Sequence, residues 1–243
     1  ASVLNYESVV PVLNSYNKDE VDFHQIVADM ANIPRSHAKL INLGLFYGMG
    51  KKKLAEQLGL DWNESETLFN KYHSHVPFVR QLMNYTSQRA NEVGSIKTIG
   101  GRKCRFNMWE PDTKGFHKAM PFDQANKEYG KHMALKRAFT YKALNRLIQG
   151  SAADQTKAAM VLLYKEGIIP HIQVHDELDI SVHDQQQANR IVEIMESSIS
   201  LKVPNKVDAE YGANWGEAKT TFSEKPLTRG LSGNHSVQLV NED

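Results

Sequence analysis

Cysteine is nearly absent from the sequence, because Cys104 is the only one among 243 residues. A single thiol can form neither an internal disulfide nor a zinc site built from several cysteines. Small secreted proteins that depend on disulfides are therefore excluded. The composition is typical of a chain that works in a reducing compartment, and we expect a cytoplasmic location.

Long apolar runs are also missing. The longest, Ala158–Tyr164, is far shorter than the roughly 18 residues that span a bilayer, so we expect no association with a membrane. Hydrophobic residues make up 41% of the chain, which is enough for one large core or two small ones.

Net charge is close to balanced, at +1, so a polyanionic partner would have to be bound by local patches. Two zones are basic: Met30–Ala55 has five Lys or Arg and no acid, and Asp112–Arg146 has eight against three acids. Solvated helix faces would explain either zone alone. Because both zones carry motifs described below, a phosphate-binding surface is favoured.

Apolar spacing predicts helices over residues 54–58, 64–72, 78–93 and 185–201, and one or two helices over 129–166. Residues 96–106 are expected to form a hairpin, and residues 170–182 have strand character. Residues 106–121 read as an exposed loop, and residues 220–243 as a loose tail. His73 and His75 cannot share a helix face, so we expect surface histidines and not zinc ligands.

The first motif follows Pro34, where a helix is expected to begin. Arg35, Lys39, Leu43 and Tyr47 recur every four residues and form one stripe along that helix. Two cations one turn apart, with no acid nearby, suit a polyphosphate, and an aromatic ring further along offers a face for a base. An amphipathic surface helix is the alternative.

Two further motifs are ambiguous when taken alone. His175-Asp176-Glu177 interrupts an apolar β pattern, which indicates either a polar hairpin turn or carboxylates that hold a divalent metal. Asn145 and Gln149 lie one helical turn apart, as base-edge readers in a minor groove could, although helix packing explains such amides as well.

In this order and spacing, the three motifs resemble the family A DNA polymerases, the bacterial DNA polymerase I type, in a phage-like form. The resemblance covers about Asp22–Ala218 and includes Thr98-x2-Gly101-Arg102 and Asn214-Trp215. It implies an α+β fold, with helical fingers over residues 22–131 and part of an antiparallel palm sheet over 132–219. Residues 1–21 would be a lead-in helix, and residues 220–243 a flexible tail.

The resemblance also implies roles for individual residues. The incoming dNTP would be bound by five of them: His24, Arg35, Lys39, Leu43 and Tyr47. Primer-template DNA would be contacted by another five: Arg102, Tyr141, Asn145, Gln149 and His175. Asp176 and Glu177 would serve two Mg²⁺ ions, with Lys39 as a catalytic proton donor to the leaving pyrophosphate.

The sequence departs from the family pattern in three places. Leu43 stands where Phe or Tyr is usual, and Tyr141 where many members have Arg. The Asp-Tyr-Ser-x-x-Glu segment is absent upstream of His24, and Asn5-Tyr6-Glu7-Ser8 does not replace it.

From this absence we expect a fragment or split polymerase, inactive without a second polypeptide that carries the thumb and the missing Asp. If a phage encodes it, the chain would work in the bacterial host cytoplasm. A catalytically inactive nucleic-acid-binding subunit is the alternative. A single-subunit RNA polymerase is less favoured, because of Glu177 and the Gln149 segment.

Overall fold

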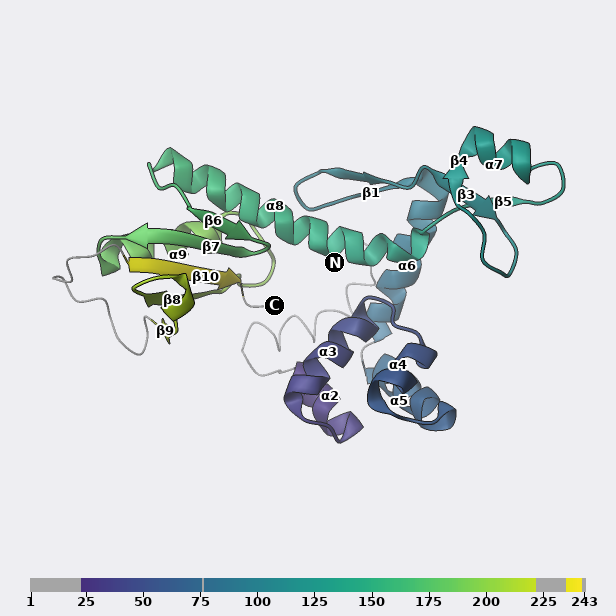
Figure 1. Cartoon of the computed structure of the whole chain (residues 1–243), viewed down its shortest axis with the longest axis horizontal. Helices are drawn as coiled ribbons and strands as arrows, with labels where there is room; N and C mark the ends of the chain where they lie inside the picture. The colour runs from purple at the N-terminus through teal and green to yellow at the C-terminus, as the bar shows by residue number, and fades with distance from the viewer. Residues whose placement is uncertain (1–22, 76, 222–234, 242–243) are drawn as a thin grey trace. The chain divides into compact units, whose positions relative to one another are not determined.

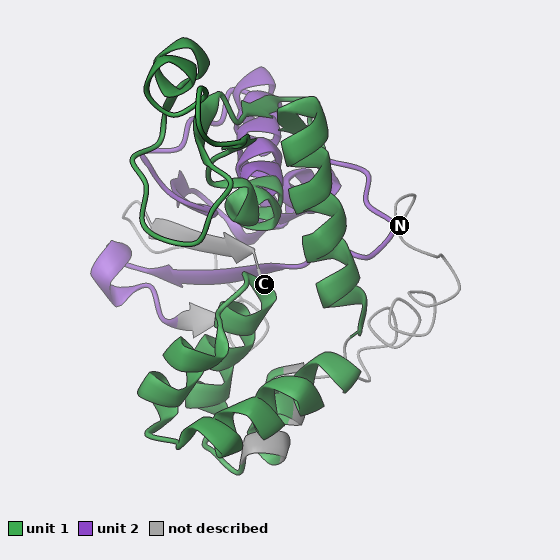
Figure 2. Ribbon diagram, turned by 90° about the vertical axis from the view of Figure 1, so that its right-hand side faces the viewer, with its two compact units in different colours: residues 1–148 green, residues 149–243 purple. Residues whose placement is uncertain are grey.

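The computed structural model describes residues 23–75, 77–221 and 235–241, so the lead-in helix expected over residues 1–21 lies outside the described residues. The chain divides into two compact units, residues 1–148 and 149–243 (Figure 1; Figure 2). Helices and small antiparallel sheets occur in both units, which confirms the expected α+β fold class. None of the helices over the described residues has the length and apolar character needed to cross a membrane.

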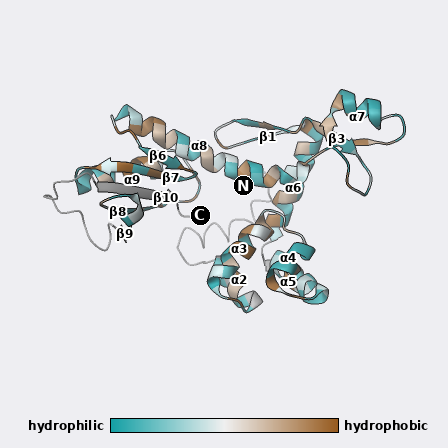
Figure 3. Ribbon diagram, viewed as in Figure 1, coloured by the Kyte–Doolittle hydropathy of each residue, from teal (hydrophilic) through white to brown (hydrophobic). Residues whose placement is uncertain are grey.

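The described part of the first unit begins with helices. Their bounds are α2 (Phe23–Ala31), α3 (Arg35–Phe46), α4 (Lys51–Leu58), α5 (Trp62–His75) and α6 (Pro77–Val93). Apolar and polar residues alternate along them, as the brown and teal bands in Figure 3 show. Their apolar faces pack into one cluster that includes Leu45, Leu54 and Tyr72. Gly59 ends α4 in the left-handed conformation that glycine adopts at low cost, with a φ of 66°.

Two small sheets follow α6. Strands β1 (Ser95–Lys97) and β2 (Lys103–Arg105) form the expected hairpin, with Ile96 opposite Cys104. A three-stranded sheet in the order β4-β3-β5 then combines β3 (Met108–Pro111), β4 (Met120–Pro121) and β5 (Leu135–Arg137), with α7 (Phe122–Glu128) between the last two. The loop expected over residues 106–121 therefore contains two strands. Residues 129–142, expected to be helical, instead hold β5 and a 3-10 turn, η1 (Thr140–Lys142).

Helix α8 (Ala143–Lys165) starts in the first unit and continues into the second. The other elements of the second unit are β6 (Ile172–Val174), β7 (Glu177–Val182), α9 (Gln185–Ser197), β8 (Val207–Gly212), η2 (Trp215–Glu217), β9 (Thr220–Thr221) and β10 (His235–Asn241). The strands pair in the order β6-β7-β10-β8-β9, and every pairing is antiparallel. Alternate β7 residues, Leu178, Ile180 and Val182, are buried against α8 and α9.

Strand β10 differs from the loose tail expected over residues 220–243. It lies between β7 and β8 and pairs with both, from His235 to Asn241. Backbone hydrogen bonds to two neighbours can order a strand whose side-chain pattern gives no periodic signal. Residues 222–234 and 242–243 lie outside the described residues.

Candidate functional site

Helix α3 presents the first motif. Its buried face consists of Ala38, Ile41 and Leu45, whereas Arg35 and Lys39 are exposed one turn apart. Pro34 precedes the helix with extended dihedral angles, as a residue at the start of a helix should. The packing of one face against the core therefore holds the two cationic side chains on the solvent side.

The C-terminal end of α3 carries the aromatic residue of the motif. Leu43 and Tyr47 are half-buried, and the Tyr47 N–H donates to the carbonyl of Leu43 over 3.0 Å. The Tyr47 ring meets the edge of Phe46, with 5.6 Å between ring centroids. Gly48 then turns the chain with a φ of 89°, a conformation that costs glycine little. The turn separates the tyrosine from α4.

His24 on α2 is held by a residue that the sequence pattern did not single out. The amide nitrogen of Asn42, on α3, lies 3.0 Å from His24 Nδ1. The hydroxyl of Tyr72, on α5, donates to Asn42 Oδ1 over 2.9 Å. Tyr72 is only 2% exposed, and burial raises the pKa of its hydroxyl well above the usual value. Asn42 lies three residues after Lys39 and one before Leu43, so the four-residue spacing of the first motif could not reveal it.

His73 corrects the expectation of a surface histidine. It is 8% exposed, and its ring meets the edges of Phe69 and Tyr72 with centroid distances of 4.5 Å and 5.2 Å. Burial, with a smaller effect of Arg80, lowers its pKa, so this histidine favours the neutral form. Its neighbours on α5 are apolar at the spacing of a helix face, which is why it turns inward.

The β1–β2 hairpin carries Arg102 in its turn. The Thr98 hydroxyl accepts a hydrogen bond from the Arg102 N–H over 3.1 Å, and Gly101 adopts a φ of 82°. Lys97 and Lys103 are directly opposite each other, and both are exposed. Like charges paired across strands are destabilising unless an anion compensates them. The exposed face of the hairpin is therefore suited to phosphate.

The amide motif lies at the start of α8. Tyr141, just before this helix, is 68% exposed, and Lys142 lies 5.6 Å from its ring centroid. Asn145 is half-buried and Gln149 is exposed, one turn further along. Arg146, between them, packs its guanidinium over Phe106 at 5.0 Å.

The second motif forms the turn between β6 and β7. Val174 pairs with Glu177, so His175 and Asp176 form a two-residue connection. His175 is exposed and adopts a φ of 53°, a left-handed conformation that is uncommon for residues other than glycine. The side-chain amide of Gln173 donates to the His175 carbonyl over 2.5 Å. The turn brings two adjacent carboxylates, Asp176 and Glu177, to its end, both half-buried.

These two carboxylates fit one side of a magnesium site. Mg²⁺ prefers carboxylate oxygens and commonly uses only one or two of them together with water and substrate phosphates. Within the described residues, no group of three or more His, Cys, Asp or Glu side chains is arranged to hold a metal ion.

Asp179 is a second carboxylate on β7, after Glu177, and no sequence pattern assigned it a role. It is 9% exposed, and among the described residues its Oδ1 has no hydrogen-bond partner. With Glu177, Trp215 and two β6 residues it lines a small pocket of the second unit. Its position on a strand of alternating apolar residues gave no signal that the carboxyl group would be buried.

Comparison with known proteins gives a consistent result. Residues 10–217 match the family described as DNA polymerase family A. A DNA-directed DNA polymerase of Pseudomonas phage M6 is 36% identical over an alignment 246 residues long, and the match covers 87% of this chain and 34% of that protein. DNA polymerase I of Rhizobium leguminosarum is 31% identical over an alignment 241 residues long, and the match covers 89% of this chain and 22% of that protein.

A solved structure is similar as well. It is the POL domain of Pol1 from M. smegmatis in complex with DNA primer-template and dNTP, with a TM-score of 0.61 at 25% identity over 79% of this chain and 34% of that chain. The chain thus spans about a fifth to a third of the length of these relatives. Because the family match extends over most of its residues, and the expected motifs lie within it, the chain belongs to DNA polymerase family A.

Proposed function

We propose that this chain is part of a template-dependent DNA polymerase that adds nucleotides from dNTPs to the 3′-hydroxyl of a primer. The observation that carries the proposal is the arrangement on α3. The chain belongs to family A, and its Arg35 and Lys39 are exposed one turn apart on α3. The opposite face of the same helix is buried in the core.

The nucleotide would be bound by residues of the first unit. The guanidinium of Arg35 suits the oxygens of a triphosphate, and the ammonium of Lys39 would donate a proton to the departing pyrophosphate. His24 would contact the same triphosphate. Leu43 would lie near the sugar, and Tyr47 would stack near the template base.

Primer-template DNA would be contacted by both units, each through its own elements. Arg102 and its basic hairpin would bind backbone phosphates, and Tyr141 would face the template. Asn145 and Gln149 would donate to base-edge acceptors in the minor groove, which are present at every base pair. His175 would lie near the primer end.

Asp176 and Glu177 would hold Mg²⁺. When bound, two such ions would activate the primer hydroxyl and compensate the negative charge on the phosphates. Two adjacent carboxylates on one turn provide only part of the ligands. We propose that a further Asp, and the thumb, come from a part of the polymerase outside these residues.

The test compares three single variants in the complete polymerase. Lys39→Ala should lower the single-turnover incorporation rate by roughly 10²- to 10³-fold, because the interaction strengthens as charge develops. Arg35→Ala should mainly raise the apparent KM for dNTP. Lys52→Ala, an exposed change in the same basic zone, is the matched control. An unchanged rate in Lys39→Ala would refute the assignment of α3.

A second candidate is a catalytically inactive nucleic-acid-binding subunit. It is favoured by one observation, namely that the described residues hold no complete set of metal ligands. Asp176→Ala separates the two functions. A polymerase should lose primer extension and retain DNA binding, whereas a pure binding subunit would show no extension in either form.

A further inference from the structure

We propose that Asn42 and Tyr72 are positioning residues that hold the His24 imidazole in the tautomer with its proton on Nε2. The ring would then offer this N–H to a phosphate oxygen of the nucleotide. Only the contact between His24 and the nucleotide rests on the proposed function. The tautomer is a property of the chain without nucleotide and can be tested independently.

Three helices meet in this arrangement. Asn42 on α3 lies between His24 on α2 and Tyr72 on α5, at 3.0 Å from His24 Nδ1 and 2.9 Å from the Tyr72 hydroxyl. Asn42 and His24 are half-buried, and Tyr72 belongs to the core cluster of the first unit. A chain of two hydrogen bonds therefore links the core to His24, a residue near the surface.

The direction of these hydrogen bonds follows from the chemistry of the amide. An asparagine side chain has an acceptor end and a donor end, so the end that faces Tyr72 decides which end faces His24. The Tyr72 hydroxyl donates to Oδ1, and the amide nitrogen must then donate to Nδ1 of the ring. A nitrogen that accepts carries no proton, so in the neutral ring the proton is on Nε2.

The reverse arrangement leaves a buried donor without an acceptor. If the Asn42 amide were turned, Tyr72 would accept from it and its own proton would need another partner. Asn42 is the hydrogen-bond partner of Tyr72 within the described residues. Burial holds the pKa of the hydroxyl well above its usual range, so the proton stays in place at neutral pH. An unpaired buried donor is costly, which favours the first arrangement.

The tautomer can be measured directly on this chain by long-range ¹H–¹⁵N NMR spectra of ¹⁵N-histidine-labelled protein. The signal of His24 is assigned by its loss in His24→Gln. In the unmodified chain we expect the pattern of an Nε2–H tautomer. Asn42→Asp replaces the donor with an acceptor of the same shape, so the proton should move to Nδ1. Tyr72→Phe should give a mixture of tautomers, and Tyr85→Phe, on exposed α6 surface, should change nothing.

An Nε2–H pattern that persists in Asn42→Asp would overturn the proposal. If Tyr72→Phe does not fold, the Asn42→Asp spectrum decides alone, because a carboxylate is isosteric with the amide.

A second readout is the affinity for dNTP, measured by fluorescence titration of the same variants in the complete polymerase. Loss of one hydrogen bond that positions His24 should weaken binding by about fivefold in Tyr72→Phe. A tautomer that responds to both variants supports the positioning role even if the complete polymerase binds no dNTP, a result that would refute only the proposed function. A tautomer insensitive to both variants overturns the positioning role at any nucleotide affinity.

Discussion

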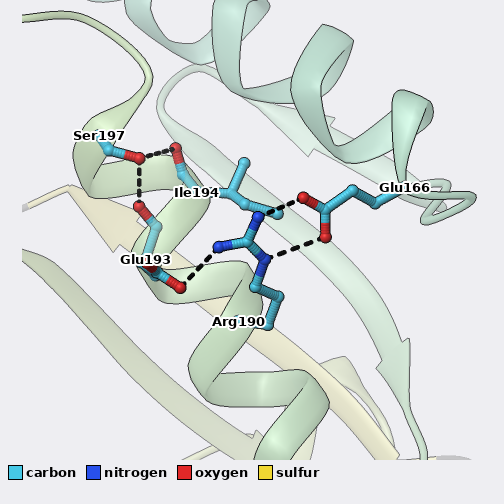
Figure 4. Close-up of polar contacts among 5 residues, drawn as sticks. All are labelled: Glu166, Arg190, Glu193, Ile194 and Ser197. Carbon is cyan, nitrogen blue, oxygen red and sulfur yellow. Dashed lines mark hydrogen bonds and ion pairs between the residues drawn. The ribbon is translucent and has the colours of Figure 1, made fainter.

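Arg190 on α9 binds both carboxylate oxygens of Glu166, the residue that directly follows α8 (Figure 4). Its Nε lies 3.0 Å from Oε2, and another guanidinium nitrogen contacts Glu193 at 2.6 Å. The hydrogen bonds from Arg190 lower the pKa of the Glu166 carboxyl group. This ion pair links the C-terminal end of α8 to α9 within the second unit.

This pair makes a pH-dependent contribution to stability. Because the folded pKa of Glu166 is below its usual value of about 4.3, the contribution is present above that value and is lost as the pH falls through the folded pKa. Arg190→Ala should therefore be less stable than the unmodified chain at pH 7, and the difference should shrink towards pH 2.

Urea denaturation at pH 7, 4 and 2 measures this difference. Arg190→Lys is the control, since it keeps the charge but loses the bidentate geometry. Its free energy of unfolding should lie between those of the unmodified chain and Arg190→Ala. A difference that stays constant across the pH range would mean that Glu166 is not the partner that matters.

Arg137 should hold the β4-β3-β5 sheet onto α6. Its guanidinium donates to the carbonyls of Asn91 and Phe106 over 3.1 Å and 2.9 Å, and it lies 4.5 Å from the Trp109 ring centroid. We expect Arg137→Ala to lower the free energy of unfolding by roughly 2–4 kcal/mol. Hydrogen exchange over residues 108–137 should accelerate. Lys136→Ala, which breaks only a surface ion pair with Asp112, should have little effect.

Leu43 should limit the use of dideoxynucleotides. Its aliphatic side chain has neither the hydroxyl nor the ring edge of a tyrosine. In the complete polymerase, Leu43→Tyr should raise the ratio of dideoxynucleotide to deoxynucleotide incorporation by roughly tenfold or more. Gel analysis of chain termination measures the ratio, and equal ratios would contradict the role proposed for this residue.

Asp179→Asn should stabilise the second unit. The carboxylate is buried, and its Oδ1 has no hydrogen-bond partner in the part of the chain that the structure describes. Removing the charge should raise the free energy of unfolding by about 1–2 kcal/mol. Asp208→Asn, an exposed change on β8, is the control in the same denaturation experiment. A loss of stability instead would indicate that Asp179 is compensated by a cation.

Local patterns in the sequence predicted the elements that follow them. The spacing of Arg35 and Lys39 gave the exposed side of α3, and the apolar alternation around His175 gave the β6–β7 hairpin. Gly101 correctly marked the turn between β1 and β2. In each case the signal and the structure it specifies lie within a few residues of each other.

Contacts between distant residues could not be predicted in this way. Asn42 reaches Tyr72 across 30 positions, and Arg137 reaches Asn91 across 46. The burial of His73 and Asp179 depends on which helix or strand covers them, because residue type alone favours exposure for aspartate and does not decide for histidine. The roles of the site residues in catalysis stay predictions that rest on the family.

The position of β10 has a consequence for assembly. Strands β7 and β8 do not pair with each other, and each uses one edge to bind β10, the last described strand of the chain. During synthesis, the β6–β7 hairpin that carries Asp176 therefore cannot be joined to β8 in one sheet until residues 235–241 have been made. The same two edges accept only one strand at a time. Any other strand offered to them, from this chain or another, would have to compete with β10 for the backbone hydrogen bonds of β7.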